Sequence, residues 1–276
     1  MKAWLYKGIN SMRLLGTLRP ITAVVGPKFT TSLKNIEIDI TFKCNLKCLN
    51  CNRSCSQAPD NSAMSVSQIE KLVLESIASG KHWGRIRLLG GEPMLHPAIF
   101  EILEVLENYR REYSPATKIE ISTNGFGVEV NDRLGRVPGY IQVNNSRKSN
   151  RYQEKFDAFN LAPCDKWYYV LTDFTNACKI SSLCGMGLNR FGYYPCTVAG
   201  SIDRVFGFNI GIKKLPDQPQ EFDEQKRTLC RYCGHFPSRS FIPPEYKISL
   251  RGEPRSKSWV KSYQRFAEKP PILSLY

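Results

Sequence analysis

The sequence has no long apolar run, and none approaches the ~18 residues that a transmembrane helix needs. Its start, MKAWLYKGINSMRLLGTLRP, lacks the continuous apolar core and the small-residue cleavage site of a secretory signal. It contains no internal repeat and no low-complexity tract, which argues against a repeat architecture. With 276 residues, of which 42% are hydrophobic, the chain is long enough for one large domain or one domain with a small extension.

Acidic residues are missing from residues 1–36, which hold six lysines and arginines. Residues 236–276 hold eight basic residues against three acidic ones, so the two ends carry eleven of the net +14 charges. Such ends are either well-solvated segments or a peripheral surface for an anionic partner, such as nucleic acid, an acidic peptide or a membrane. The N-terminal segment also has the composition of an organelle transit peptide or an interfacial helix.

Four of the ten cysteines fall within the twelve residues CNLKCLNCNRSC, residues 44–55. Their spacing also fits the buried stripe of a helix, but the residues between them favour loops and caps: Asn45, Asn50, Asn52 and Ser54. The stretch follows IEIDIT, residues 36–41, which alternates as a half-buried strand does. Ten cysteines could form five disulfides. However, the clustered spacing and the absent signal favour metal or redox chemistry in a reducing cytoplasm.

Strands and helices alternate after this loop. We expect helices over residues 65–80 (with a capping box from Ser67 to Glu70), 97–113, 129–135 and 151–159, and strands over 85–93, 117–125, 139–145 and 167–171. This order is typical of parallel β/α units. Residues 36–172 hold about five units, short of the eight of a closed barrel. We therefore predict an α/β fold with a partial, TIM-like (β/α) barrel.

The composition changes beyond residue 175, where glycines and aromatic residues predict a β-hairpin followed by LCRYCGH. We divide the chain into a basic N-terminal extension (1–35), the partial barrel (36–175), a small cysteine-rich hairpin module (176–240) and a basic C-terminal tail (241–276).

The spacing Cys44-x3-Cys48-x2-Cys51 can hold three corners of a [4Fe-4S] cluster and leave the fourth iron open for a ligand. Two alternatives remain at this point. Cys55 could complete a structural zinc site. The run from Cys48 to Cys55 also matches part of a ferredoxin pattern.

The three-cysteine loop after a first barrel strand resembles that of the radical S-adenosylmethionine (radical SAM) superfamily. The resemblance covers roughly residues 36–172. GGEP, at the end of the second strand, is similar to the family's motif for the amino group of S-adenosylmethionine: Gly90, Gly91, Glu92 and Pro93. Ser122 and Asn124 of ISTNG would then reach the ribose, with Asn144 of IQVNN near the same pocket. One departure is Asn50, where the family has an aromatic residue beside the adenine.

The C-terminal module resembles the shortened, SPASM-like auxiliary-cluster domain called twitch. This resemblance implies a second cluster on four cysteines: Cys184, Cys196, Cys230 and Cys233. The spacing between the hairpin glycine and Cys196 is one residue shorter than in the family. A four-cysteine zinc knuckle is the alternative.

The resemblance implies an enzyme that reductively cleaves S-adenosylmethionine at a [4Fe-4S] cluster to a 5′-deoxyadenosyl radical, which takes a hydrogen from the substrate. A reductase or flavodoxin-type protein would donate the electron. We expect peptide modification (epimerisation or cross-linking) first and a small molecule of natural-product or cofactor synthesis second. A nucleic-acid substrate such as tRNA comes last, because no RNA-binding motif is evident. A non-catalytic iron–sulfur or zinc protein is the alternative outside enzymes.

Cysteines outside the two predicted sites could return a hydrogen to a substrate radical, as in epimerases of this superfamily. Cys164 and Cys178 are the candidates, with Cys55 as a further spare thiol. The alternative is that these cysteines are buried packing residues.

Overall fold

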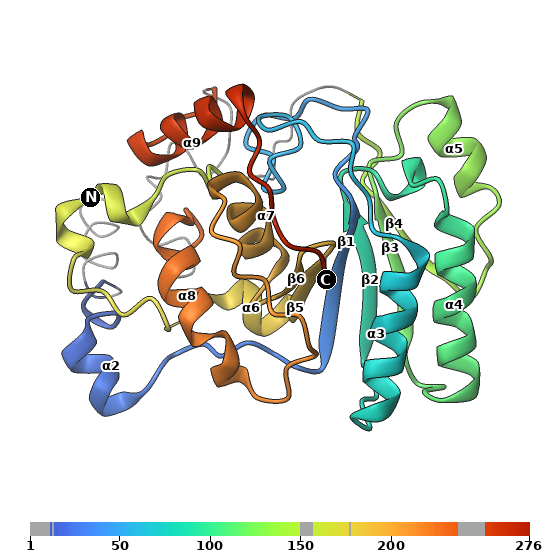
Figure 1. Cartoon of the computed structure of the whole chain (residues 1–276), viewed down its shortest axis with the longest axis horizontal. Helices are drawn as coiled ribbons and strands as arrows, with labels where there is room; N and C mark the ends of the chain where they lie inside the picture. Colours follow the sequence, from blue (N-terminus) through green and yellow to red (C-terminus); the bar gives the residue numbers. More distant parts are fainter. Residues whose placement is uncertain (1–11, 13, 150–156, 177, 237–251) are drawn as a thin grey trace, which may run out of the picture.

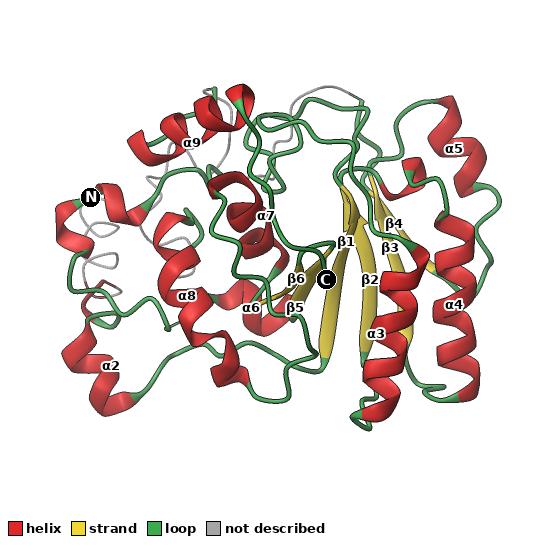
Figure 2. Ribbon diagram, viewed as in Figure 1, coloured by secondary structure: helices red, strands yellow, loops and turns green. Residues whose placement is uncertain are grey.

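A computed structural model describes residues 12, 14–149, 157–176, 178–236 and 252–276. A six-stranded sheet in the order β4-β3-β2-β1-β5-β6 forms its centre (Figures 1 and 2). The strands are β1 (Asn35–Thr41), β2 (Arg85–Gly90), β3 (Lys118–Thr123), β4 (Gln142–Asn145), β5 (Met186–Asn189) and β6 (Gly192–Tyr194). All neighbouring strands are parallel except β5 and β6. The predicted partial (β/α) barrel is confirmed.

The described helices are α2 (Arg19–Val25), α3 (Val66–Ala78), α4 (Ile99–Glu112), α5 (Val128–Leu134), α6 (Lys179–Cys184), α7 (Thr197–Phe206), α8 (Asp223–Leu229) and α9 (Lys257–Glu268). Three of the four predicted helices of the barrel are confirmed as α3, α4 and α5. Most of the fourth, 151–159, lies outside the described residues. None of the helices in the described part of the chain is both long enough and apolar enough to cross a membrane.

The capping box of α3 sits two residues earlier than predicted. Ser65, not Ser67, accepts a hydrogen bond from the backbone N–H of Gln68, and the Gln68 side chain accepts one from the backbone of Ser65. Both pairs have the right spacing in the sequence, and the Ser65 pair lets the helix start at Val66.

The predicted strand over residues 167–171 is wrong. Its aromatic and β-branched residues suggested a strand, but Trp167–Tyr169 form a 3-10 helix. The amides of Tyr169 and Val170 bond the carbonyls three residues earlier, so these groups are satisfied locally. Only Tyr169 is buried, while Trp167 is 85% exposed.

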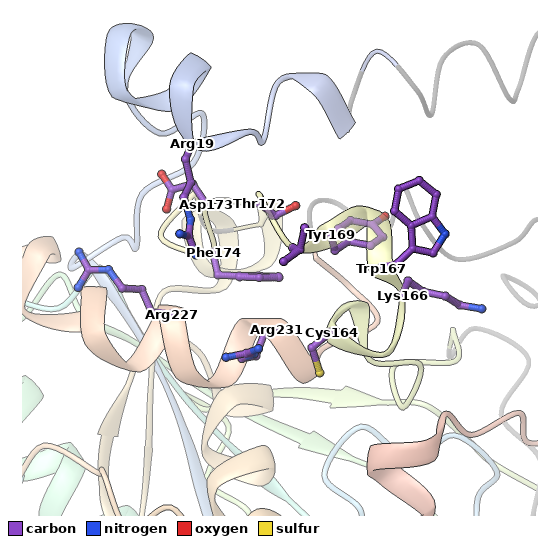
Figure 3. Close-up of a pocket in the computed structure, with 11 residues that line it drawn as sticks. Arg19, Cys164, Lys166, Trp167, Tyr169, Thr172, Asp173, Phe174, Arg227 and Arg231 are labelled. Atoms are coloured by element: carbon purple, nitrogen blue, oxygen red, sulfur yellow. The ribbon is translucent and has the colours of Figure 1, made fainter.

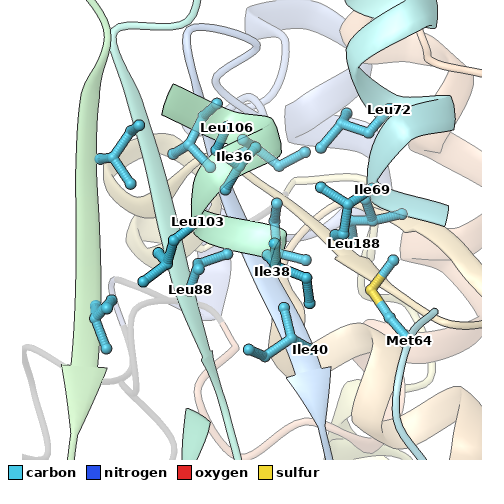
Figure 4. Packing of buried hydrophobic residues seen from close by; sticks show 14 of the residues in the cluster. Ile36, Ile38, Ile40, Met64, Ile69, Leu72, Leu88, Leu103, Leu106 and Leu188 are labelled. Atoms are coloured by element: carbon cyan, nitrogen blue, oxygen red, sulfur yellow. The ribbon is translucent and has the colours of Figure 1, made fainter. Parts of the chain in front are cut away.

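The main core lies on one face of the sheet, under α3 and α4. Ile36, Ile38 and Ile40 of β1 are fully buried there (Figure 4). They pack in one cluster with helix residues such as Ile69, Leu72, Leu103 and Leu106. The alternate residues of β1 point to the other, concave face of the sheet. They are also buried, so β1 is covered on both faces rather than on one as predicted.

The hairpin of β5 and β6 belongs to the central sheet and does not form a separate module. β5 pairs with β1 in parallel register, from Ile36 opposite Met186 to Asp39 opposite Asn189. A Cβ on Gly185, just before β5, would overlap the backbone carbonyl of Asn35, so only glycine allows this close approach. The predicted boundary at 175/176 therefore separates two strands that are neighbours in the sheet.

The two chain ends, where described, are ordered parts of the fold. The C-terminal segment predicted as a tail contains α9, whose Trp259, Tyr263 and Phe266 are buried against α7 in a second core cluster. Near the N-terminus, α2 follows Leu18, which forms an antiparallel bridge with Thr172. The described basic residues of the two ends are thus exposed residues of segments that pack against the fold.

Candidate functional site

The cysteine loop starts directly after β1, at the carboxyl end of the sheet. The loop contains no helix between Phe42 and Ser56, which rules out the buried helical stripe, and Asn50 and Ser54 have positive φ angles of 50° and 54°. Burial raises the pKa of the Cys44 thiol to about 11, and the nearby charges of Cys51 and Cys48 act in the same direction. Four thiols share this short loop, those of Cys44, Cys48, Cys51 and Cys55, and none of the ten cysteines forms a disulfide.

Cys51 is prepared to be a thiolate. A hydrogen bond with the Cys55 thiol, followed by the backbone N–H groups of Arg53 and Cys55, lowers the pKa of Cys51 to about 6, although burial opposes the shift. The same hydrogen bond and burial raise the pKa of Cys55 well above its usual value. Because metals bind the thiolate form of cysteine, Cys51 is suited to be a metal ligand. Cys55 is suited to donate a hydrogen bond to the Cys51 thiolate.

The GGEP motif holds the chain that leads into Cys44. The backbone N–H of Gly91 donates to the carbonyl of Thr41 at 2.7 Å, and that of Glu92 donates to the carbonyl of Lys43 at 2.8 Å. Gly90 has a φ of 126°, and a Cβ on it would overlap the Thr41 carbonyl. Two glycines are thus required for the end of β2 to lie against this segment.

Glu92 is fully buried, and both of its carboxylate oxygens are occupied. Oε1 accepts hydrogen bonds from Thr123 Oγ1 (2.7 Å) and the Met94 amide (3.1 Å), and Oε2 accepts one from the Asn124 amide (2.7 Å). Burial raises the pKa of this carboxyl, and the hydrogen bonds partly offset the rise. Glu92 therefore joins the end of β2 to the end of β3.

The three polar residues predicted on β3 and β4 have different positions. Asn124 lies at the cysteine loop, where its Nδ2 is 2.8 Å from Asn45 Oδ1 and 3.9 Å from Cys44 Sγ. Ser122 and Asn144 are paired residues of neighbouring strands on the concave face. Asn144 Nδ2 donates to Glu120 at 3.2 Å. Asn124 is thus at the cysteine loop, whereas Ser122 and Asn144 lie on the concave face.

Charged residues that the sequence analysis did not single out cover the concave face. Arg87 of β2 bridges Glu37 (2.9 Å) and Glu120 (2.8 Å). Arg53 of the cysteine loop lies 3.2 Å from Asp39 and 3.6 Å from Glu37. Burial raises the pKa of Asp39 to about 6, while the Arg53 charge opposes the shift. The signal in the sequence was the charged residue at alternate positions of β1, β2 and β3.

A second set of cysteines surrounds a small cavity with mostly apolar walls. Four of its lining residues are Cys178, Cys196, Cys230 and Cys233, and apolar neighbours include Leu229 and Phe236. Burial raises the pKa of Cys196 and Cys233, and the charges of the neighbouring cysteines add to the rise. In the described residues, no three His, Cys, Asp or Glu side chains converge as on a single metal ion. The four thiols therefore surround a cavity and do not converge on the position of a single metal ion.

Cys184, predicted to belong to this set, lies elsewhere. Helix α6 runs from Lys179 to Cys184, so Cys178 stands at its start and Cys184 at its end, next to the sheet. The backbone carbonyl of Cys184 accepts from Arg85 at 3.2 Å. Burial raises the pKa of its thiol to about 11, and the adjacent Glu37 adds to the rise. Cys184 is thus near the charged concave face, and Cys178 takes its place in the cavity.

This geometry defines a class of protein: a partial (β/α) barrel with three thiols at the carboxyl ends of its strands, next to a glycine-rich strand end. Residues 38–144 match the sequence model of the Radical SAM superfamily, and they contain all three of these thiols. Residues 38–144 thus carry a Radical SAM domain.

Similar sequences match only part of their own length. A probable GTP 3′,8-cyclase of Methanothermobacter thermautotrophicus (strain ATCC 29096) is 31% identical over 126 residues, which are 46% of this chain and 36% of that protein. A probable GTP 3′,8-cyclase of Methanococcus maripaludis (strain C5) is 29% identical over 117 residues, or 42% of this chain and 37% of that protein. The chain thus spans little more than a third of the length of these relatives.

Among solved structures, BtrN in complex with AdoMet and 2-DOIA is similar, with a TM-score of 0.44 and 14% identity over 75% of this chain and 95% of that one.

Proposed function

We propose that this protein cleaves S-adenosylmethionine reductively and uses the resulting radical to take a hydrogen atom from a substrate on the concave face. The observation that carries the proposal is the junction of the cysteine loop, GGEP and the end of β3, joined by the hydrogen bonds of Gly91, Glu92 and Asn124. When bound at this junction, a [4Fe-4S] cluster supplies the electron for the cleavage.

The chain's own residues hold and shield this site. Cys44, Cys48 and Cys51 would hold the cluster through their three thiolates. The strand-end carbonyls beside Gly90 and Gly91 would accept from the amino group of the cofactor. Glu92 holds the ends of β2 and β3 together through its hydrogen bonds with Thr123 and Asn124.

The test is 5′-deoxyadenosine formation after anaerobic reconstitution with iron and sulfide. Cys48→Ala should abolish the product and lower the iron content of the reconstituted protein, since only two of the three proposed ligands of this cluster remain. Cys164→Ala is the matched control, because Cys164 lies outside this loop. Full product from Cys48→Ala would refute the proposal.

For the substrate, the concave face favours a small polar molecule, the second choice of the sequence analysis, over a peptide. The face carries Glu37, Asp39, Arg87 and Glu120, and Asp39 Oδ2 has no hydrogen-bond partner among the described residues. A charged, partly enclosed face matches a ligand with several polar groups. Peptide modification gains no specific support from these contacts.

The structure also changes the candidate for a hydrogen donor. Cys178 lines the four-cysteine cavity and Cys164 lines an outer cavity, whereas Cys184 lies beside Glu37 of the concave face. We propose Cys184 for this role, because its raised pKa keeps it a thiol with a hydrogen to give. In deuterated water, Cys184→Ala should lose deuterium from the product, while Cys164→Ala should keep it. Equal labelling in both variants would exclude the role.

We further propose that Cys178, Cys196, Cys230 and Cys233 hold an auxiliary [4Fe-4S] cluster. The supporting observation is that the four thiols surround an apolar cavity, as ligands on the outside of a cluster must. Reconstituted protein should then bind about eight irons. Cys178→Ala should bind about four, and Cys184→Ala should keep the wild-type content. One zinc per chain in place of the second cluster would refute this assignment.

A further inference from the structure

A cavity of about 580 Å³ opens on the side of the molecule away from α3 and α4 (Figures 1 and 3). Three segments that are distant in the sequence form it. Arg19 comes from α2, residues 164–174 form one wall, and Arg227 and Arg231 come from α8 and the turn after it. Its volume lies within the range of small-molecule sites.

The lining of this cavity is strongly cationic. Arg19, Lys166, Arg227 and Arg231 all line it and are exposed, and Asp173 is the only acidic residue among the described residues of the lining. The Asp173 carboxylate already accepts from the Thr175 amide (2.9 Å) and hydroxyl (2.6 Å). None of the ion pairs between described residues involves the four cations. Among the described residues, no ion pair neutralises these four charges.

The hydrogen bonds that hold α2 in place also fix this cavity. The backbone N–H of Arg19 donates to the Leu171 carbonyl at 3.0 Å, and that of Asp173 donates to the Thr17 carbonyl at 2.7 Å. Further along, the Lys28 amide donates to Asn176 Oδ1 at 2.7 Å. The backbone that carries Arg19 is thus preorganised opposite α8, which lowers the entropy cost of binding.

We propose that this cavity binds a phosphorylated small molecule that carries at least two negative charges. Guanidinium groups from separate segments suit phosphate oxygens, because each presents several N–H donors in one plane. The concave shape favours a compact ligand over the flat surface of a protein partner. Tyr169 and Phe174 line the inner part of the cavity and provide apolar contact for the organic part of the ligand. The site is separate from the cysteine loop, so it does not depend on the proposed radical chemistry.

Cys164 provides a reporter inside the cavity. Burial and the charge of Asp165 raise the pKa of its thiol, whereas the charge of Arg231 and a hydrogen bond with that residue act in the opposite direction. A ligand that engages Arg231 would remove this contact and cover the thiol. Alkylation of Cys164 should therefore slow when the cavity is filled.

The test uses the full chain, without cofactor or reductant, and inorganic pyrophosphate as the probe. Calorimetry should detect binding that weakens as salt is added. The double variant Arg227→Gln/Arg231→Gln should bind about tenfold or more weakly, since the charge-assisted hydrogen bonds of two guanidinium groups are lost. Arg111→Gln on α4, an exposed arginine on another part of the molecule, is the matched control and should bind as the wild type does.

Site-resolved mass spectrometry gives the second readout. Pyrophosphate should slow the alkylation of Cys164 and leave that of Cys184 unchanged. The proposal is overturned if millimolar pyrophosphate gives neither heat nor protection, or if the double variant binds as tightly as the wild type. Tighter binding of poly-glutamate than of pyrophosphate, lost in the same variant, would overturn it in favour of an acidic polypeptide.

Discussion

Glu92 is a single buried side chain that joins the ends of β2 and β3 at the candidate site. The resemblance to the family suggested a carboxylate that receives the cofactor's amino group. In the structure, both oxygens of Glu92 are occupied by donors from the ends of β2 and β3. The residue could be selected from the sequence. Its partners could not, because they depend on the register of two neighbouring strands.

Replacing Glu92 by Gln should therefore cost stability as well as cofactor affinity. The amide would place an N–H group against the donors now held by the carboxylate, and a buried unsatisfied donor costs about 1–3 kcal/mol. Urea unfolding of the cluster-free protein measures the loss. Glu129→Gln, an exposed change on α5, is the control and should lie within about 0.5 kcal/mol of the wild type. An unchanged urea midpoint for Glu92→Gln would contradict the role of Glu92 in joining the ends of β2 and β3.

His96 is a second buried polar residue, and the sequence analysis did not select it. It is 1% exposed, and its Nε2 lies 2.8 Å from the Met64 carbonyl, while its Nδ1 accepts from the Ala98 amide at 3.1 Å. The neutral ring, with the proton on Nε2, satisfies both contacts. Burial lowers its pKa, and the charge of Arg133 adds to the shift, while the contact with Met64 opposes it.

This lowered pKa predicts the direction of a pH effect. Below about pH 6.5, the unfolded chain takes up a proton at His96 that the folded chain resists. Stability should thus be complete above that pH and fall as pH decreases, by at most about 1.4 kcal/mol per pH unit from this residue. In urea unfolding, the His96→Gln variant should be less stable than the wild type. Its free energy of unfolding should also change less between about pH 6.5 and 5. His82→Gln, at an exposed site, should keep the wild-type slope.

At the scale of elements, the sequence predicted what depends on local pattern. The strands β1 to β4 and the helices α3 to α5 have clear periodicity and end at glycines or caps, so their positions were found within a few residues. Residues 167–171 were misassigned because their composition suits a strand while local hydrogen bonds form a 3-10 helix. The sequence analysis placed Cys184 in the second cysteine set, where the structure has Cys178. Spacing along the chain does not show which end of α6 faces the cavity.

The role of helix α9 was the least predictable from the sequence, because its basic residues suggested a solvated tail. Trp259 is fully buried, packs at 5.0 Å from Phe159 between ring centroids, and donates from Nε1 to the Tyr232 carbonyl at 2.7 Å. Trp259 thus fastens α9 to the turn that carries Cys230 and Cys233.

Trp259→Ala should destabilise the protein by about 3–5 kcal/mol, because it leaves a large cavity beside this turn. We also expect lower iron content at the second cysteine set, since the turn between Cys230 and Cys233 loses its contact with α9. Val260→Ala changes the neighbouring, 40% exposed side chain and should have a much smaller effect on both measurements. A stable Trp259→Ala variant would mean that α9 is dispensable for the fold.

For the whole molecule, sequence and structure agree on the partial barrel but differ on how many units the chain contains. The change in composition after residue 175 suggested a second module. The structure instead places β5 beside β1, the strand that leads into the cysteine loop. This pairing joins residues about 150 apart, and contacts at such separation are not visible in local pattern.

The position of β5 has a consequence for any attempt to divide the chain. A fragment that ends at residue 175 keeps the cysteine loop and β2 but loses β5, one of the two strands that pair with β1. The Ile36–Asp39 stretch would then present its backbone N–H and C=O groups to water as an open sheet edge. We expect such a fragment to self-associate in size-exclusion chromatography, while the full chain elutes as a compact species. A monodisperse, folded fragment would show that the first four strands can stand alone.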